Sequence, residues 1–251
     1  MNNVIVAFLL TLIAGLSTLV GAIFIFFKFN LSKLTKYALA FASGVMISVS
    51  FTDLLPESLS LILSTNSKNQ SFFYLALFII LGVVLSAMID KLLPENEKIH
   101  NKKLYKLGIF SMLAIIMHNI PEGIATFLSS TANLHLGLTL TVAIALHNIP
   151  EGISISVPVY GSTKSRKKAL GYTFISGMAE PLGAILAFFF LKPFITDFLM
   201  GILLAIIAGI MLHIGSLQLL PTAMKYPEKK KTFIFFLIGF CFMIISHFLM
   251  K

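Results

Sequence analysis

The hexapeptide His-Asn-Ile-Pro-Glu-Gly occurs twice in this chain, at residues 118–123 and again at residues 147–152. Each copy lies inside a long apolar stretch. An ionisable side chain at the centre of a bilayer costs at least about 2.5–3.5 kcal/mol on insertion scales, so such residues usually mark a functional site. Six identical residues that recur 29 positions apart are not typical of chance. The repeat therefore predicts a functional site shared by two apolar helices.

The composition predicts an all-α membrane protein. Hydrophobic residues make up 57% of the 251 positions and charged residues 12%, whereas a soluble domain has about 25% charged residues. The apolar runs are long and continuous, which favours membrane-spanning helices over the short alternating strands of a barrel. We expect a single domain over residues 1–251 with eight spans, at about 4–27, 37–63, 72–92, 107–130, 135–160, 169–191, 196–223 and 232–250.

The basic residues are unevenly distributed between the loops. Sixteen of the 19 lysines and arginines lie in or beside the loops between spans 1 and 2, 3 and 4, 5 and 6, and 7 and 8. The positive-inside rule places these loops in the cytoplasm and both termini outside the cell membrane. A net charge of +9 arranged in this way serves membrane insertion and does not indicate nucleic-acid binding. Cys241 is the single cysteine, which excludes an intrachain disulfide and a cysteine-based zinc site.

A second, weaker repeat involves spans 2 and 7. Residues 44–46 and 209–211 both follow the pattern Gly-x-Met, and each is followed by Leu-Leu-Pro at the same spacing. Spans 2 and 7 run in opposite directions, as do spans 4 and 5. We therefore predict an inverted repeat, with spans 1–3 related to spans 6–8 around spans 4 and 5. Such folds bind their substrate near the bilayer midplane, on helices broken by Pro or Gly.

The repeated hexapeptide has the chemistry of a metal site. His118 and Glu122 are four residues apart, so they share one face of a helix, and His147 and Glu151 repeat this spacing. Imidazole and carboxylate are ligands for divalent transition metals. Glu180, which precedes a proline, adds a third carboxylate from span 6. The predicted cluster, with room for one or two ions, comprises His118, Asn119, Glu122, His147, Asn148, Glu151 and Glu180.

Other residues are candidates for the route of an ion. Asp53 and Glu57, near the outer end of span 2, predict an outer access pathway. Met46 lies seven residues before Asp53 on the same helical face, and its thioether suits a soft metal or ordinary core packing. His213 in span 7 is a candidate pathway residue. Two further polar residues near span ends are assigned no role, namely Asp90 and His247.

These residues resemble the ZIP family of zinc and iron transporters, in its bacterial branch. The resemblance covers essentially the whole chain and rests on the two hexapeptides, on Met-Ala-Glu-Pro-Leu-Gly at 178–183 and on Phe-Thr-Asp-Leu-Leu-Pro-Glu at 51–57. It implies uptake of divalent metal, chiefly Zn²⁺, from outside into the cytoplasm. It also implies a homodimer, in which spans 1, 4, 5 and 6 move against spans 2, 3, 7 and 8.

The resemblance further implies a binuclear centre. Its main site would be formed by His118, Glu122 and Glu151, with His147 and Met46 nearby. The second site would use Asn119, Asn148 and Glu180, with Glu122 and Glu151 bridging the two ions. This chain departs from the family at Gln218, where relatives often carry a carboxylate, so the exit pathway formed by His213 and Gln218 is expected to be less acidic. The loop at 91–106 has only His100, so a histidine-rich sensing loop is not expected.

The residues alone leave two other readings open. In an intramembrane metalloenzyme, the same ligands would hold a catalytic metal. However, His-Glu-x-x-His is absent and the spacing is not the Glu-x-x-His of di-iron bundles, so we expect a protein that is not an enzyme. A passive channel would use the same ligands as a carrier. Nitrogen and oxygen ligands without thiolate admit Zn²⁺, Fe²⁺, Mn²⁺, Co²⁺, Ni²⁺ or Cd²⁺, bound as substrate and not as a cofactor.

Overall fold

The computed structural model describes residues 2–27, 30–92, 101–191, 194 and 196–249. Over these residues the regular elements are helices, and eight helical stretches are long and apolar enough to cross a membrane. This confirms the all-α membrane class and the number of spans predicted from the sequence. The segment at 93–100, with His100, lies outside the described residues. The eight stretches are Asn3–Phe26, Leu31–Leu63, Lys68–Leu92, Lys102–Ala132, Leu134–Thr163, Arg166–Phe190, Asp197–Met224 and Lys229–Leu249.

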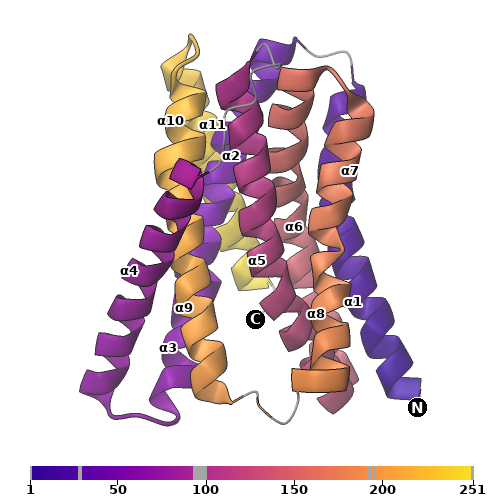
Figure 1. Ribbon diagram of the computed structural model, residues 1–251, viewed down its shortest axis with the longest axis vertical. Coiled ribbons are helices and arrows are strands. Elements are labelled where there is room, and N and C mark those ends of the chain that lie inside the picture. The colour runs from indigo at the N-terminus through magenta and orange to yellow at the C-terminus, as the bar shows by residue number, and fades with distance from the viewer. Residues whose placement is uncertain (1, 28–29, 93–100, 192–193, 195, 250–251) are drawn as a thin grey trace.

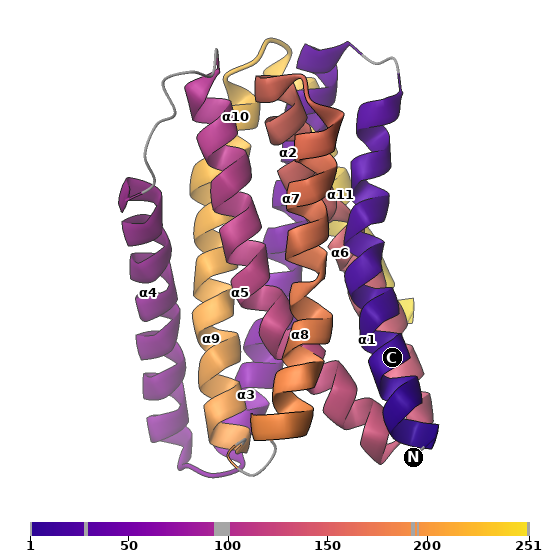
Figure 2. The same ribbon diagram turned by 45° about the vertical axis from the view of Figure 1, so that its right-hand side comes forward.

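The helices form two groups that pack mainly among themselves (Figures 1 and 2). The first group, called here the hexapeptide bundle, contains both repeats. It consists of α1 (Asn2–Gly21) with η1 (Ala22–Phe26), α5 (Lys102–Ala132), α6 (Leu134–Thr163), α7 (Arg166–Gly177), α8 (Ala179–Leu186) and η3 (Ala187–Leu191).

The second group, called here the outer bundle, contains the two Leu-Leu-Pro segments. It consists of α2 (Leu31–Val49), η2 (Ser50–Leu54), α3 (Leu55–Leu63), α4 (Lys68–Leu92), α9 (Asp197–His213), η4 (Ile214–Leu219), α10 (Leu220–Met224) and α11 (Lys229–Leu249). The largest contact between the two bundles is the packing of α2 on α6, and a smaller one joins α5 to α9.

Several helices begin a few residues before the predicted apolar spans. The reason is N-terminal capping. The side chain of Asn30 accepts a hydrogen bond from the backbone N–H of Lys33 at 3.2 Å, and Asn101 accepts one from Leu104 at 3.2 Å. A capping side chain satisfies a backbone N–H that has no partner within the helix. Hydropathy therefore detects the apolar middle of each span, whereas the helix starts at a polar residue nearer the membrane surface.

Glycines set the closest approaches within the hexapeptide bundle. A Cβ atom on Gly123 would lie 2.0 Å from the carbonyl oxygen of Glu180, and one on Gly152 would lie 1.9 Å from that of Thr18. Both contacts are far shorter than van der Waals separation, so only glycine permits them, as at small-residue contacts between membrane helices. The last residue of each hexapeptide thus fixes α5 against α8 and α6 against α1.

The two Leu-Leu-Pro segments have similar local structures. In each case a π-helical stretch, η2 or η4, directly precedes the helical turn that contains the proline, Pro56 or Pro221. A proline has no N–H to offer to the carbonyl four residues earlier, and a local π-turn is a common adjustment at such a point. The segments α2–α3 and α9–α10 run in opposite directions (Figure 1). The inverted repeat of the whole chain stays a prediction.

Candidate metal centre

The two hexapeptides meet where α5 faces α6. The Nε2 atom of His147 lies 2.8 Å from Oε1 of Glu122, and Nε2 of His118 lies 3.1 Å from the same oxygen. The Nε2 atom of His118 is also 3.4 Å from Oε1 of Glu151. Each hexapeptide directs its His and Glu to one face because residues four apart are neighbours on a helix surface. One oxygen of Glu122 therefore lies between the imidazoles of both repeats.

This geometry suits a divalent transition metal. Potential ligand atoms of His118, Glu122 and His147 all lie within 4.8 Å of one another. Because zinc–nitrogen and zinc–oxygen bonds are about 2.0–2.2 Å long, a modest inward movement of these side chains would bring them around one ion. The three side chains and Glu151 are all buried. The site is therefore shielded from bulk solvent by the packing of α5 and α6.

Unpartnered polar atoms also fit a metal ion. Among the described residues, Nδ1 of His118, Oε2 of Glu122 and Oε2 of Glu151 are buried without a hydrogen-bond partner. Buried polar atoms nearly always have such a partner, and each exception needs an explanation. A bound cation would satisfy carboxylate oxygens that the helices themselves leave unpaired.

The amides and the third carboxylate form a neighbouring group. Asn148 donates hydrogen bonds to Oε1 of Glu180 and to the carbonyl of Ala14, the latter at 3.0 Å. Asn119 donates to the carbonyl of Ser176 at 3.2 Å. Their amide N–H groups are thus directed to neighbouring helices, while both Oδ1 atoms and Oε2 of Glu180 have no hydrogen-bond partner within the described part of the chain. Hard oxygen ligands for a second cation are available here.

Met46 is fully buried on α2 within the apolar core of the bundle. Its placement agrees with core packing. Its role as a thioether ligand stays a prediction.

The predicted access residues lie on η2 and α3. Asp53 does not stand alone, because its Oδ1 is 2.7 Å from Nδ1 of His247 at the end of α11. Glu57 is exposed. The sequence analysis assigned no role to His247, and no local pattern could have indicated one, since the two residues are 194 positions apart.

The predicted exit residues lie near the other end of the bundle. Gln218 of η4 donates a hydrogen bond to Oδ2 of Asp90 at 3.1 Å, and Nζ of Lys106 is 3.4 Å from Oδ1 of Asp90. His213 is buried, with Nδ1 2.9 Å from Oγ of Ser86. Asp90, which the sequence analysis left without a role, thus joins α4 to both η4 and α5.

Comparison with known proteins shows which family the sequence matches. Residues 94–247 match the sequence model of the ZIP zinc transporter family. Three similar proteins are each named zinc transporter ZupT. The one from Oceanobacillus iheyensis is 40% identical over 98% of both chains, and that from Chlorobium phaeovibrioides is 42% identical over 98% of both. The third, from Chlorobaculum parvum, is 41% identical over 90% of this chain and 91% of its own.

Proposed function

The chain belongs to the ZIP zinc transporter family, and on this premise we propose that it carries divalent metal ions, chiefly Zn²⁺, across a membrane. The observation that supports this most directly is the buried group of His118, Glu122 and His147 on two apolar helices. An ion-binding group at this place would hold a dehydrated cation between the two ends of the bundle. The relatives are named transporters, and we accordingly assign transport to this chain and no enzymatic reaction.

The ligand positions suggest how the ion moves. The carboxylates and imidazoles of the cluster come from α5, α6 and α8, which all belong to the hexapeptide bundle. Within that bundle the glycine contacts of Gly123 and Gly152 hold these helices close together. We propose that this bundle moves as one body against the outer bundle and carries the bound ion with it. This would be a carrier mechanism, with two alternately exposed states.

Two polar pairs, Asp53 with His247 and Gln218 with Asp90, suggest the route of the ion on either side of the cluster. We assign Asp53, with Glu57 beyond it, to access from outside. His213 and Gln218 are assigned to release. A cation leaving toward Gln218 would meet the carboxylate of Asp90, which accepts a hydrogen bond from Gln218 and forms an ion pair with Lys106. The resulting pathway has carboxylates at both ends and three in the middle.

Orientation and assembly complete the proposal. The lysine-rich end of the bundle would face the cytoplasm, with both termini outside the cell membrane, because positively charged loops are retained on the inner side. The active form would be a homodimer, as the family resemblance implies. One or two ions would bind per chain, with Glu122 and Glu151 bridging them. Fe²⁺, Mn²⁺, Co²⁺, Ni²⁺ and Cd²⁺ would also be accepted, since the ligand set contains no thiolate that would narrow the choice.

Flux of zinc into proteoliposomes tests this proposal. The wild type would be compared with Glu122→Ala and Glu151→Ala, and with Asp197→Ala as a matched control that removes an exposed carboxylate to which no role is assigned. We expect saturable uptake by the wild type and the control, and loss of uptake in both cluster variants with the protein still monodisperse. Normal transport by both cluster variants would remove the support for the proposed site. Faster uptake with zinc already inside would favour a carrier over a channel.

A further inference from the structure

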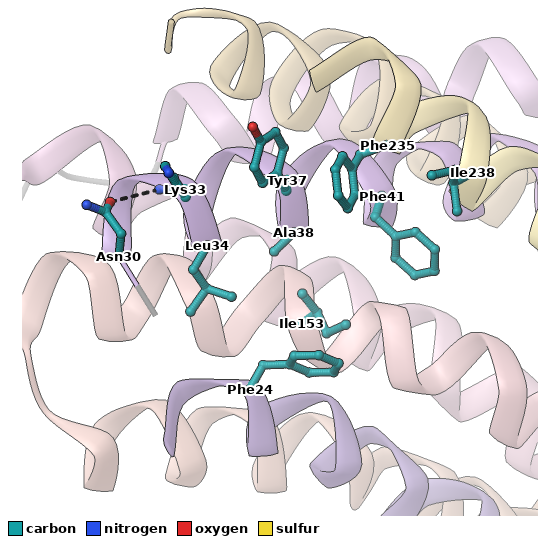
Figure 3. Close-up of a pocket in the computed structure, with 10 residues that line it drawn as sticks. All are labelled: Phe24, Asn30, Lys33, Leu34, Tyr37, Ala38, Phe41, Ile153, Phe235 and Ile238. Atoms are coloured by element: carbon teal, nitrogen blue, oxygen red, sulfur yellow. Dashed lines mark hydrogen bonds between the residues drawn. The ribbon is translucent and has the colours of Figure 1, made fainter. Parts of the chain in front are cut away.

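A cavity of about 510 Å³ lies at the lysine-rich end, between the two bundles (Figure 3). Its walls come from four elements, represented by Phe24 of η1, Phe41 of α2, Ile153 of α6 and Ile238 of α11. Its volume is within the usual range for small-molecule sites, about 300–1,000 Å³. Most of its lining side chains are hydrocarbon. The cavity differs chemically from the candidate metal site, because none of its lining residues carries a carboxylate or an imidazole.

One side of this cavity opens toward the surroundings of the bundle. The exposed fractions of Phe24, Phe235 and Ile238 are 39%, 37% and 49%. All three belong to stretches that are apolar enough to span a membrane. In the bilayer their exposed faces meet lipid chains. An occupant that enters from this side must therefore be largely apolar.

The mouth of the cavity is positively charged. Lys33 is the charged residue among those that line it, and it is exposed at the first turn of α2, next to the capping residue Asn30. Within the described residues Lys33 makes no ion pair. The nearby carboxylate of Glu228 is already engaged, since it lies 2.6 Å from Nζ of Lys36 and 2.6 Å from Nζ of Lys231. The acid at this corner is neutralised, and Lys33 stays available for an anion.

We propose that this groove binds an anionic phospholipid, with an acyl chain in the apolar cavity and the phosphate at Lys33. A single cation at the mouth of an apolar, laterally open cavity matches the two ends of such a lipid. Basic residues at the membrane surface attract anionic lipid by about 1 kcal/mol each, which is about fivefold in affinity. The lipid would contact α2 of the outer bundle and α6 of the hexapeptide bundle, at the largest junction between them. The proposal goes beyond metal transport and does not depend on it.

Retention of lipid by the purified protein tests the proposal. The full chain would be reconstituted in bilayers of equimolar phosphatidylglycerol and phosphatidylcholine with identical acyl chains, extracted in mild detergent, and its bound lipids counted by native mass spectrometry. Two variants probe the two ends of the lipid. Lys33→Gln removes the charge, and Ala38→Phe fills the cavity (Figure 3). Their matched controls are Lys167→Gln and Ala76→Phe, which make the same changes at exposed positions away from the groove.

We expect the wild type to retain phosphatidylglycerol in preference to phosphatidylcholine. Lys33→Gln should lower this preference about fivefold, Ala38→Phe should lower retention of both lipids, and the controls should match the wild type. Equal retention of both lipids by the wild type, or unchanged retention by Ala38→Phe, would overturn the proposal. The proposal would also be overturned if the wild type were a dimer and Ala38→Phe converted it to a monomer with no loss of bound lipid. The groove would then be occupied by a second chain and not by a lipid. Lys33→Gln alters only an exposed side chain, so it keeps the test decisive if Ala38→Phe does not fold. An unchanged lipid preference in Lys33→Gln would also overturn the proposal.

Discussion

The Oε1 atom of Glu122 on α5 lies 2.8 Å from Nε2 of His147 on α6, so a carboxylate of the first hexapeptide contacts an imidazole of the second. His118 reaches across in the opposite sense, with Nε2 3.4 Å from Oε1 of Glu151. The two motifs are therefore interleaved as one group of side chains. We propose that both copies contribute ligands to the same ion, because neither copy alone would surround it.

The shared position of Glu122 makes its side-chain length critical. In Glu122→Asp the charge is kept but the carboxylate is withdrawn by one methylene, away from both imidazoles. We expect zinc affinity to fall at least tenfold, which corresponds to about 1.4 kcal/mol. Isothermal titration calorimetry in detergent would measure it, with Asp197→Glu as the control that changes the length of an exposed carboxylate side chain by one methylene. Equal affinity for Glu122→Asp and the wild type would contradict the prediction that the length of this side chain is critical.

A second prediction concerns the contact between α5 and α8. Gly123→Ala would place a Cβ atom 2.0 Å from the carbonyl oxygen of Glu180, a backbone atom that cannot move aside. We expect a destabilisation of at least about 1–3 kcal/mol, which is typical of overpacking. Gly171→Ala in α7 is the matched control, since its Cβ would meet no atom within 4 Å. That variant should gain up to about 1 kcal/mol from helix propensity. Relative to the wild type, the unfolding temperature in detergent should therefore fall for Gly123→Ala and rise for Gly171→Ala. Shifts of the same sign in both variants would contradict this explanation.

Much of the fold follows from the sequence because hydrophobicity and backbone hydrogen bonding leave few choices in lipid. The eight apolar runs predict eight helices, and the four-residue spacing of His118 and Glu122 predicts their shared face. The spacing could not predict that His147 would contact Glu122 rather than the Glu151 of its own helix. That choice depends on the rotation of α6 against α5. Close backbone contacts, such as that of Gly152 with Thr18, hold α6 in the bundle.

The missed residues have a common cause. Asp90 and His247 lie near the ends of apolar runs, where solvation at the membrane surface is a sufficient explanation of a polar residue. Their partners, Gln218 and Asp53, are more than a hundred positions away in the chain. Periodicity describes neighbours within one helix, so it carries no information on such pairs. Only the tertiary packing reveals them.

A third prediction concerns acid stability at the lysine-rich end. Hydrogen bonds from Lys231, Lys36 and Tyr37 lower the pKa of Glu228 from its ordinary 4.5 to about 2. A carboxylate whose pKa is lower in the folded state stabilises the fold above its unfolded pKa, and this contribution is lost as the pH falls toward the folded value. The wild type should therefore be more stable than Glu228→Gln by a constant amount from pH 8 to pH 5, and the difference should shrink between about pH 4.5 and pH 2.

Thermal unfolding of both proteins across this pH range would measure the effect. Lys167→Gln, an exposed change of one charge unit at the same end, is the control for a general effect of net charge. A difference between wild type and Glu228→Gln that persists unchanged at pH 2 would rule out the ionised carboxylate as the source of the stabilisation.

The last prediction concerns the pair of Asp53 and His247. If this pair receives the ion from outside, both side chains act on the same step. Their single variants, Asp53→Asn and His247→Gln, should each raise the KM for zinc uptake with little change in kcat, because the buried cluster is intact. The double variant should raise KM no further than the stronger single variant. Such non-additivity corresponds to a coupling free energy between the two side chains of about 1 kcal/mol, which is a factor of about five in KM. Coupling of this size is found for residues that share one interaction.

Unfolding temperature separates this role from a structural one. The bond of 2.7 Å joins η2 to the end of α11, so it could serve only to hold α11 in place. In that case the variants would lower the unfolding temperature and the number of active molecules, which reduces the maximal rate and leaves KM unchanged. A change in KM at constant unfolding temperature would instead assign the pair to the ion's path. Asp53 favours this outcome, because its side chain is 41% exposed and can meet a hydrated cation before the buried cluster does.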